Sequence, residues 1–285
     1  ARCFWTFNRF EITRIQWKAT GVPRLTYASA VPASRKSRQL AAELEKTQTA
    51  VGKWAIRITG HKVAPEFVIG ELGGSTFEAR EARSKIRYFA RISAMDSNRW
   101  PRMILTTMVI EKIQTQAVER LGYLRGNNSC RDVPLEYTIY NKPKIAFFND
   151  NVKKRIKEKM EDMWQENMSS KSSLALYRKY KERGKTARGL YQNSRGSALL
   201  ALARTGMLPS RTHRARYQHI DPHCIKCGID DETIPHIIMG CTHHHVEDDE
   251  IARRLGLSGQ NDDEDTRIET TRLLEEWENE TRRIC

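Results

Sequence analysis

The stretch from Cys224 to Cys241 reads CIKCGIDDETIPHIIMGC, and its spacing is the most specific pattern in the chain. Cys224 and Cys227 are separated by two residues, so both thiolates can bind one ion from a tight turn. Eight residues separate Cys227 from His236, and four separate His236 from Cys241. Three thiolates and one imidazole complete a tetrahedral shell and leave no position for water. We therefore predict one structural Zn²⁺ ion in this stretch.

The residues between the ligands agree with this prediction. Gly228 follows the second cysteine, where a tight turn needs a backbone angle that glycine adopts easily. Thr233 and Pro235 are typical of the start of a short helix that presents His236. Gly240 lets the chain turn back towards the metal, because the last cysteine would not share the helical face of the histidine.

Other cysteines and histidines leave alternatives open. The run His243, His244 and His245 could replace Cys241 or His236 as a ligand, although a polar surface turn fits its spacing better. Two unrelated thiols and a core histidine are the plain alternative to the whole site, and the combined spacing argues against it. Clustered rather than evenly distributed cysteines favour metal binding in a reducing compartment. Three cysteines have no assignable role: Cys3, Cys130 and Cys285.

The charge is distributed unevenly. The chain carries 49 Lys and Arg against 35 Asp and Glu, a formal net charge of +14. Residues 221–285 hold 7 basic against 17 acidic residues, whereas residues 1–220 hold 42 against 18. A surplus of this size creates a positive field that attracts polyanions, whereas a merely soluble surface mixes both signs. The composition therefore predicts contact with nucleic acid.

Basic residues flank possible stacking residues just before the metal site. Arginine can hold a phosphate through two parallel hydrogen bonds, and aromatic rings can stack on unpaired bases. The candidate phosphate-binding residues are Lys153, Lys154, Arg155, Arg178, Lys179, Arg195, Arg204, Arg211, Arg214 and Arg216. The candidate stacking residues, for which core packing is the alternative, are Trp164, Tyr177, Tyr180 and Tyr191.

Apolar periodicity predicts a mainly α fold, without strands or internal repeats. A helix over 34–59 should place Leu40, Leu44, Gln48, Val51, Trp54 and Ile58 on one face and end at Gly60. A second helix should open at Ser75-Thr76-Phe77-Glu78, with Ala82, Ile86 and Phe89 facing inward. A third should cover residues 103–121, and a fourth should start after Asp150 as its cap. A further helix is expected over residues 198–205.

Composition and turn residues divide the chain into five expected regions. These are a helical thumb- or connector-like region at 1–122, a linker at 123–149, a basic helical region at 150–220, the zinc module at 221–245 and an acidic helical tail at 246–285. No apolar run approaches the ~20 residues that cross a bilayer. Since the chain begins with Ala1 rather than Met, we expect a fragment of a longer intracellular protein.

Several motifs occur together with the cysteine–histidine cluster described above. They are Leu25-Thr26-Tyr27-Ala28, Gly70-Glu71-Leu72-Gly73, Ser75 to Ala82, Tyr191-Gln192-Asn193-Ser194-Arg195-Gly196-Ser197, Ala203-Arg204-Thr205-Gly206 and Leu274-Glu275-Glu276-Trp277. This set resembles the carboxy-terminal part of non-LTR retrotransposon reverse transcriptases, and looks most like tick transposon polyproteins. The similarity extends from about Leu25 to the end.

The resemblance implies a connector after the polymerase thumb, without the polymerase active site. The family's Phe/Tyr-x-Asp-Asp turn is absent, since Gly228-Ile229-Asp230-Asp231 lacks the aromatic residue. The acidic runs 247–250 and 262–265 could suggest a two-metal nuclease, but a solvated acidic flank explains them better. Only 44 residues follow Cys241, which is short for an independent nuclease core. We therefore expect no enzyme activity in this chain itself.

Two functions remain open from the sequence. In the first, the chain binds RNA, target DNA or both, and assists target-primed reverse transcription beside an upstream polymerase domain, in a ribonucleoprotein of nucleus and cytoplasm. In the second, zinc only staples a protein-interaction adaptor, and the acidic segment docks another protein or covers the basic face. Neither function involves a membrane.

Overall fold

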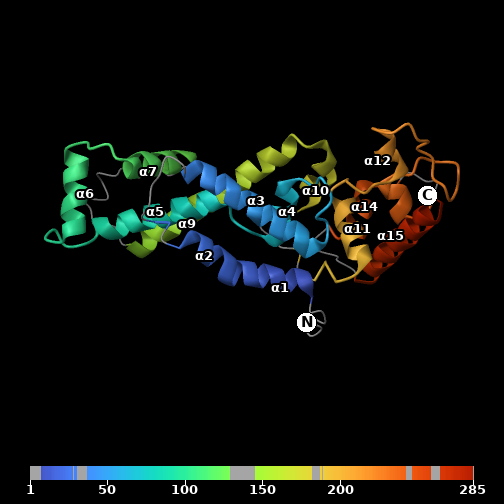
Figure 1. Cartoon of the computed structure of the whole chain (residues 1–285), viewed down its shortest axis with the longest axis horizontal. Coiled ribbons are helices and arrows are strands. Elements are labelled where there is room, and N and C mark those ends of the chain that lie inside the picture. The colour runs from blue at the N-terminus through green and yellow to red at the C-terminus, as the bar shows by residue number, and fades with distance from the viewer. Residues whose placement is uncertain are drawn as a thin grey trace. The chain divides into compact units, whose positions relative to one another are not determined.

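The computed structural model describes residues 8–27, 29–30, 37–128, 145–181, 187, 189–241, 246–257 and 264–284. This part of the chain is mainly helical, as predicted, and contains no β-strand (Figure 1). None of its helices has the length and apolar character that crossing a lipid bilayer requires. The elements are α1 (Arg9–Gln16), η2 (Trp17–Gly21), α2 (Val22–Thr26), α3 (Ser37–Ile56), α4 (Pro65–Leu72), α5 (Phe77–Ser93), α6 (Trp100–Ile110), α7 (Gln116–Asn127), α9 (Ile145–Ser169), η3 (Ser172–Leu174), α10 (Ala175–Tyr180), α11 (Arg195–Arg204), α12 (Arg211–Ala215), α13 (Ile234–Ile238), α14 (Asp248–Arg254) and α15 (Glu264–Ile284).

The chain forms two compact units. Unit 1 comprises Ala1–Gln16, Thr49–Gly73 and Gln165–Cys285, and unit 2 comprises Trp17–Gln48 and Gly74–Trp164. Helices α3 and α9 each contribute residues to both. Neither unit is therefore a single continuous stretch of sequence.

Unit 2 has a core shared by α5, α7 and α9. Helix α5 starts after Thr76, whose side-chain oxygen accepts a hydrogen bond from the backbone N–H of Ala79 at 3.2 Å. The predicted helix start is thus confirmed, since this bond satisfies a free donor of the first turn. Ala82 and Ile86 are buried as predicted, and Phe89 is partly buried. They pack with Leu121 and Leu124 of α7 and with Val152 and Ile156 of α9.

Two predicted helix boundaries in unit 2 are wrong. Residues 103–121 form parts of two helices, because Lys112 adopts a positive φ of 50° and Thr115 caps the next helix by accepting from Val118 N–H. Asp150 lies inside α9, which starts at Ile145, so it is no cap. The predicted linker at 123–149 is helical at both ends, and residues 129–144 lie outside the described part.

The predicted apolar face of α3 is also wrong in part. Leu40 is 60% exposed and Trp54 is 48% exposed, whereas the intervening Gln48 is buried. The buried stripe instead contains small residues such as Ala41 and Gly52, and a Cβ at Gly52 would lie 2.2 Å from Val68 Cγ1. Close approach of α4 therefore selects the small-residue face. The helix ends at Ile56 rather than Thr59, because Arg57 and not Gly60 adopts the positive φ, here 66°.

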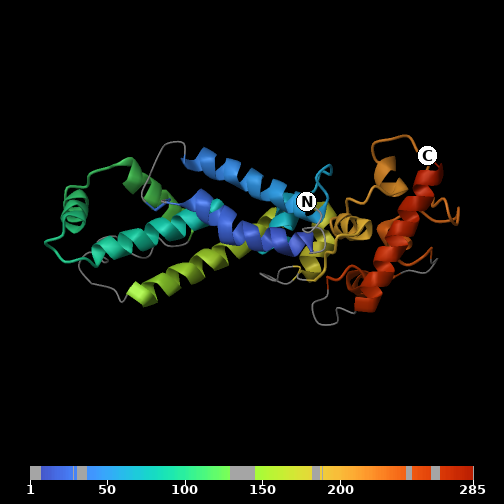
Figure 2. The ribbon, with the colours of Figure 1, turned by 60° about the horizontal axis from the view of Figure 1, so that its bottom comes forward.

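In unit 1, α15 packs against α11 and α13 (Figures 1 and 2). Helix α11 is capped by Ser194, and all its residues from Gly196 to Arg204 are buried, whereas Arg195 at its first position is exposed. Gly196 permits the close approach, since a Cβ there would lie 2.2 Å from Thr271 Cγ2. Leu274 is fully buried in the same contact. The acidic C-terminal helix is therefore an integral part of the core of unit 1.

Candidate metal centre and basic surface

A short hairpin-like turn carries the first two cysteines. Cys224 N–H donates to the carbonyl of Asp230 at 2.8 Å, and an isolated antiparallel bridge joins His223 to Asp231. Gly228 N–H donates back to the Cys224 carbonyl at 2.8 Å and adopts the left-handed φ of 67°. Glycine takes this conformation without the steric penalty of a Cβ. Its predicted role in the turn is confirmed.

The third ligand lies on α13. Thr233 caps this helix by accepting a hydrogen bond from the backbone N–H of His236 at 3.3 Å, and Pro235 occupies its first turn. Proline suits that position because its fixed φ is helical and no N–H partner is needed there. The His236 side chain is consequently held in a buried position, 6% exposed. The short presenting helix predicted from the sequence is confirmed.

The chain reverses after α13 to return the last cysteine. Gly240 and Cys241 have positive φ values of 70° and 62°, and Cys241 N–H donates to the carbonyl of His236 at 3.0 Å. A left-handed conformation costs a non-glycine residue about 1–2 kcal/mol. Such strain concentrates at functional sites, where surrounding contacts hold it. Here the strained residue is itself one of the four predicted ligands.

The structure brings the four predicted ligands together. Their donor atoms all lie within 4.8 Å of one another. Cys224 Sγ is 3.7 Å from Cys241 Sγ, and Cys227 Sγ is 3.4 Å from His236 Nε2. Zinc bonds of about 2.3 Å to sulfur and about 2.0 Å to nitrogen place tetrahedral ligand atoms about 3.5–3.8 Å apart. A disulfide would need about 2.05 Å between the sulfurs. The cluster is therefore sized to hold one metal ion.

The thiols differ in acidity for local reasons. Hydrogen bonds from the backbone N–H groups of Asp230 and Ile229 lower the pKa of Cys227 to about 6. Burial, together with the neighbouring Cys224, raises the pKa of Cys241 to about 12. Metals bind the thiolate form, and a bound cation would stabilise all the thiolates that otherwise repel one another.

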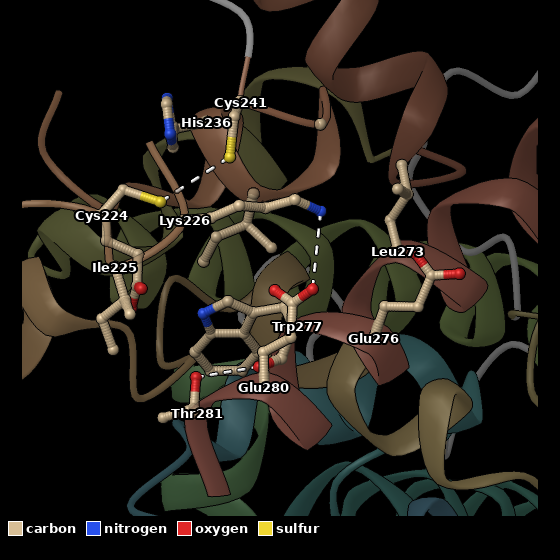
Figure 3. A pocket seen from close by; sticks show the side chains of 13 residues that line it. Cys224, Ile225, Lys226, His236, Cys241, Leu273, Glu276, Trp277, Glu280 and Thr281 are labelled. Carbon is tan, nitrogen blue, oxygen red and sulfur yellow. Dashed lines mark hydrogen bonds and ion pairs between the residues drawn. The ribbon is translucent and has the colours of Figure 1, made fainter. Parts of the chain in front are cut away.

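A pocket of about 190 Å³ lies between the cluster and α15 (Figure 3). Cys224, Cys241 and the indole of Trp277 line it, and an ion pair of 3.7 Å between Lys226 and Glu280 lies at the same place. The indole Nε1 is buried and has no hydrogen-bond partner among the described residues. The metal cluster thus adjoins the C-terminal helix directly.

His243, His244 and His245 lie outside the described residues, as do Cys3, Cys130 and Cys285. The possibility that one of these histidines replaces a ligand stays open.

The prediction that Arg204 binds phosphate is wrong. Its side chain is 2% exposed and donates to both carboxylate oxygens of Glu71 and to the carbonyls of Leu255 and Gly256. The prediction that Tyr177 and Tyr191 stack on unpaired bases is also wrong, because these two side chains are buried too. Both rings are buried, and both hydroxyls donate to Glu71, at 2.7 and 2.6 Å. These residues belong to the core.

Other predicted basic residues of unit 1 have protein partners. Lys179 pairs with Asp248 at 2.9 Å, and Arg195 pairs with Glu278. Of the remaining candidate stacking residues, Tyr180 donates a hydrogen bond from its hydroxyl to Asp249. Trp164, which belongs to unit 2, is half-buried. Arg211 donates to the carbonyl of Asp221. By contrast Arg178 and Arg216 are exposed and have no ion pair within the described residues, and Arg214 is half-buried.

In unit 2, the predicted basic residues lie on α9. Lys153, Lys154 and the neighbouring Lys157 are exposed, and Arg155 is half-buried. Lys154 is 3.9 Å from Glu158, and Lys157 is 3.6 Å from Glu161. Exposed pairs of this kind contribute about 0.2–1 kcal/mol, so they can give way to another anion.

Sequence reasoning missed a row of arginines on α5. Arg83, Arg87 and Arg91 are exposed at steps of four residues and so share one helical face. None of them has an ion pair among the described residues. The acids of the same helix point elsewhere: Glu81 pairs with Arg120 at 2.6 Å, and Glu78 accepts from Asn127 at 3.2 Å. The regular spacing was a signal available in the sequence.

No protein-family profile, curated protein or solved structure matches this chain. The resemblance to non-LTR retrotransposon reverse transcriptases therefore stays a prediction from the motifs.

Proposed function

We propose that this protein binds nucleic acid through unit 2 and that unit 1 holds one structural Zn²⁺ ion. The observation that carries the proposal is the row formed by Arg83, Arg87 and Arg91. These three guanidinium groups have no ion pair among the residues that the structure describes, and Arg91 only lies over the ring of Tyr88, so their charges are available to an external anion. Phosphates satisfy such groups bidentately, and binding releases the counterions of the nucleic acid.

The charge of the two units supports the same assignment. Unit 2 holds 24 Lys and Arg against 13 Asp and Glu, whereas unit 1 holds 25 against 22. Most of the net positive charge therefore belongs to unit 2, which also contains the predicted basic residues Lys153, Lys154 and Arg155. A positive field of this kind accelerates association with polyanions.

The metal site has a structural role in this proposal. Four protein ligands complete a tetrahedral zinc shell, and such sites contribute directly to folding. The ion would fix the turn of Cys224 to α13 and the adjoining surface of α15. Zinc is favoured over softer or harder metals by the combination of three sulfurs and one nitrogen.

The resemblance supplies the biological setting of the proposal. The chain would act as the part of a reverse transcriptase that follows the thumb, holding element RNA, target DNA or both. It would work beside an upstream polymerase domain, in a ribonucleoprotein of nucleus and cytoplasm, and without catalytic activity of its own.

Titration of binding affinity against salt tests the proposal. The logarithm of the association constant for single-stranded nucleic acid should fall linearly with the logarithm of salt concentration. The variant Arg83→Ala/Arg87→Ala/Arg91→Ala should reduce the steepness of that line by about 2, at about 0.7 per lost phosphate contact.

The matched control removes three arginines that already have partners. Arg253, Arg272 and Arg282 of unit 1 pair with Glu250, Glu276 and Glu278. Changing these three arginines to Ala alters the net charge by the same amount as the α5 variant does. The dependence of the association constant on salt should nevertheless stay close to that of the wild type. Equal losses in both triple variants would refute the α5 assignment. Affinity that is independent of salt would refute nucleic-acid binding and favour the alternative, a zinc-stapled protein adaptor.

A further inference from the structure

Helix α6 presents an unusual surface directly after α5. None of its described side chains is buried, and Trp100 at its first position is 75% exposed. Met103 and Ile104, one turn later, are 46% and 56% exposed. Large apolar side chains gathered on one face mark a binding surface more often than singly scattered ones do.

Trp100 follows the last arginine of the row by nine residues, across one short connection. Residues 94–99 connect α5 to α6 through hydrogen-bonded turns, with Met95 N–H donating to Ile92 at 3.1 Å and Arg99 N–H donating to Asp96 at 3.0 Å. Both helices belong to unit 2, and Figure 1 shows α6 just beyond the end of α5, across the connecting loop. Arg91 closes the row on α5, and the exposed Arg99 directly precedes the indole.

This arrangement combines the two features that single-stranded nucleic acid requires. Guanidinium groups follow the phosphate backbone, and an exposed indole offers a flat surface to an unpaired base. In a duplex the base faces are covered by their neighbours, so they cannot stack on a side chain without unstacking.

We propose that Arg83, Arg87, Arg91 and Trp100 form a contact surface for single-stranded nucleic acid, with Trp100 stacking on an unpaired base. The inference rests on the proposed function and adds the substrate class. Charge favours this occupant over a second copy of the chain, because two surfaces of net positive charge repel each other. Stacking is tolerant of sequence, so little base preference is expected.

Affinities for a 20-nucleotide oligothymidylate and for a 20-base-pair duplex test the proposal. Trp100→Ala should weaken single-strand binding by about 5- to 100-fold and leave duplex binding unchanged. Because an indole releases no counterions, the salt slope should stay that of the wild type. The arginine triple variant should instead lower the slope for both ligands.

Two further variants act as controls. Trp100→Phe should retain most of the single-strand affinity, since a phenyl ring also stacks. Trp54→Ala removes another exposed tryptophan, 48% exposed and covered by Arg9 at 3.7 Å, and should change neither affinity. Circular dichroism verifies that each variant keeps its helical content.

Each remaining outcome has a definite meaning. Wild-type single-strand affinity in Trp100→Ala, together with a weakened arginine triple variant, overturns stacking and leaves the proposed function intact. Self-association that Trp100→Ala abolishes, with strand affinity unchanged, assigns α6 to a protein contact and also overturns stacking. Absence of binding to either ligand by the wild type overturns both proposals.

Discussion

The guanidinium of Arg204 donates to both carboxylate oxygens of Glu71, at 3.1 and 3.3 Å, in a part of unit 1 where both side chains are almost fully buried. Lys181 lies 3.1 Å from the same carboxylate, and the hydroxyls of Tyr177 and Tyr191 donate to it. This network joins α4, α10 and α11. Since its members come from distant segments, it specifies how these helices meet in unit 1.

Glu71→Gln should strongly destabilise unit 1. Removing the carboxylate leaves Arg204 and Lys181 buried without a counter-charge, and breaking a buried pair in this way costs about 3–5 kcal/mol. Urea unfolding measures the loss. Glu43→Gln, which removes the exposed partner of Lys46, should cost less than about 1 kcal/mol. Similar urea midpoints for the two variants would show that the buried Glu71 contributes no more to stability than the exposed Glu43.

The same carboxylate predicts a dependence of stability on acid pH. Burial alone would raise the pKa of Glu71, but Arg204, Lys181 and the two tyrosines lower it from 4.5 to about 2. Because the pKa of Glu71 is lower in the folded than in the unfolded state, its ionised carboxylate stabilises the folded state at pH values above about 4.5. This contribution to the free energy of unfolding is lost as the pH falls from about 4.5 towards 2. The full contribution is about 3 kcal/mol. The unfolding free energies of wild type and Glu71→Gln should therefore converge over this range; a constant difference would contradict the pKa.

Metal removal should destabilise the region around α13 and α15. We expect about one zinc ion per chain, measured by elemental analysis, because all four ligands are present. His236→Ala should lose the ion, whereas His223→Ala, an exposed neighbour bonded to Asp221, should retain it. Zinc should also dissociate at acid pH, since protons compete for sulfur and imidazole. Stoichiometric zinc in His236→Ala would show that the ligand set is different.

Two glycine-to-alanine changes should have opposite effects. Gly196→Ala should destabilise by about 1–3 kcal/mol, because the added Cβ would lie 2.2 Å from Thr271 Cγ2 and 2.9 Å from its carbonyl oxygen. Gly122→Ala in α7 should stabilise by about 0.5–1 kcal/mol, because open space surrounds that position and alanine favours a helix.

Thermal unfolding measures both changes. Thr271→Ser removes the Cγ2 methyl group and should relieve part of the Gly196→Ala penalty. A Gly196→Ala variant as stable as the wild type would mean that α11 and α15 do not approach as closely as described.

The sequence by itself determined the local geometry of the metal site. The cap formed by Thr233, the reversals at Gly228 and Gly240, and the spacing of the ligands all act over a few residues. Such features depend on short-range backbone preferences, which can be predicted from the residue types of a few neighbouring positions. The same holds for the start of α5 at Thr76.

Only the tertiary structure decided which basic and aromatic side chains are available to a partner. Periodicity shows that residues share a helical face, but the packing of other helices decides whether that face is covered. Arg204 and Tyr191 became core residues because Glu71 from a distant segment meets them. Arg87 has no ion pair within the described part of the chain because Glu78 and Glu81 of the same helix bind side chains of α7 instead. Which cations are available therefore depends on contacts between residues that lie far apart along the chain.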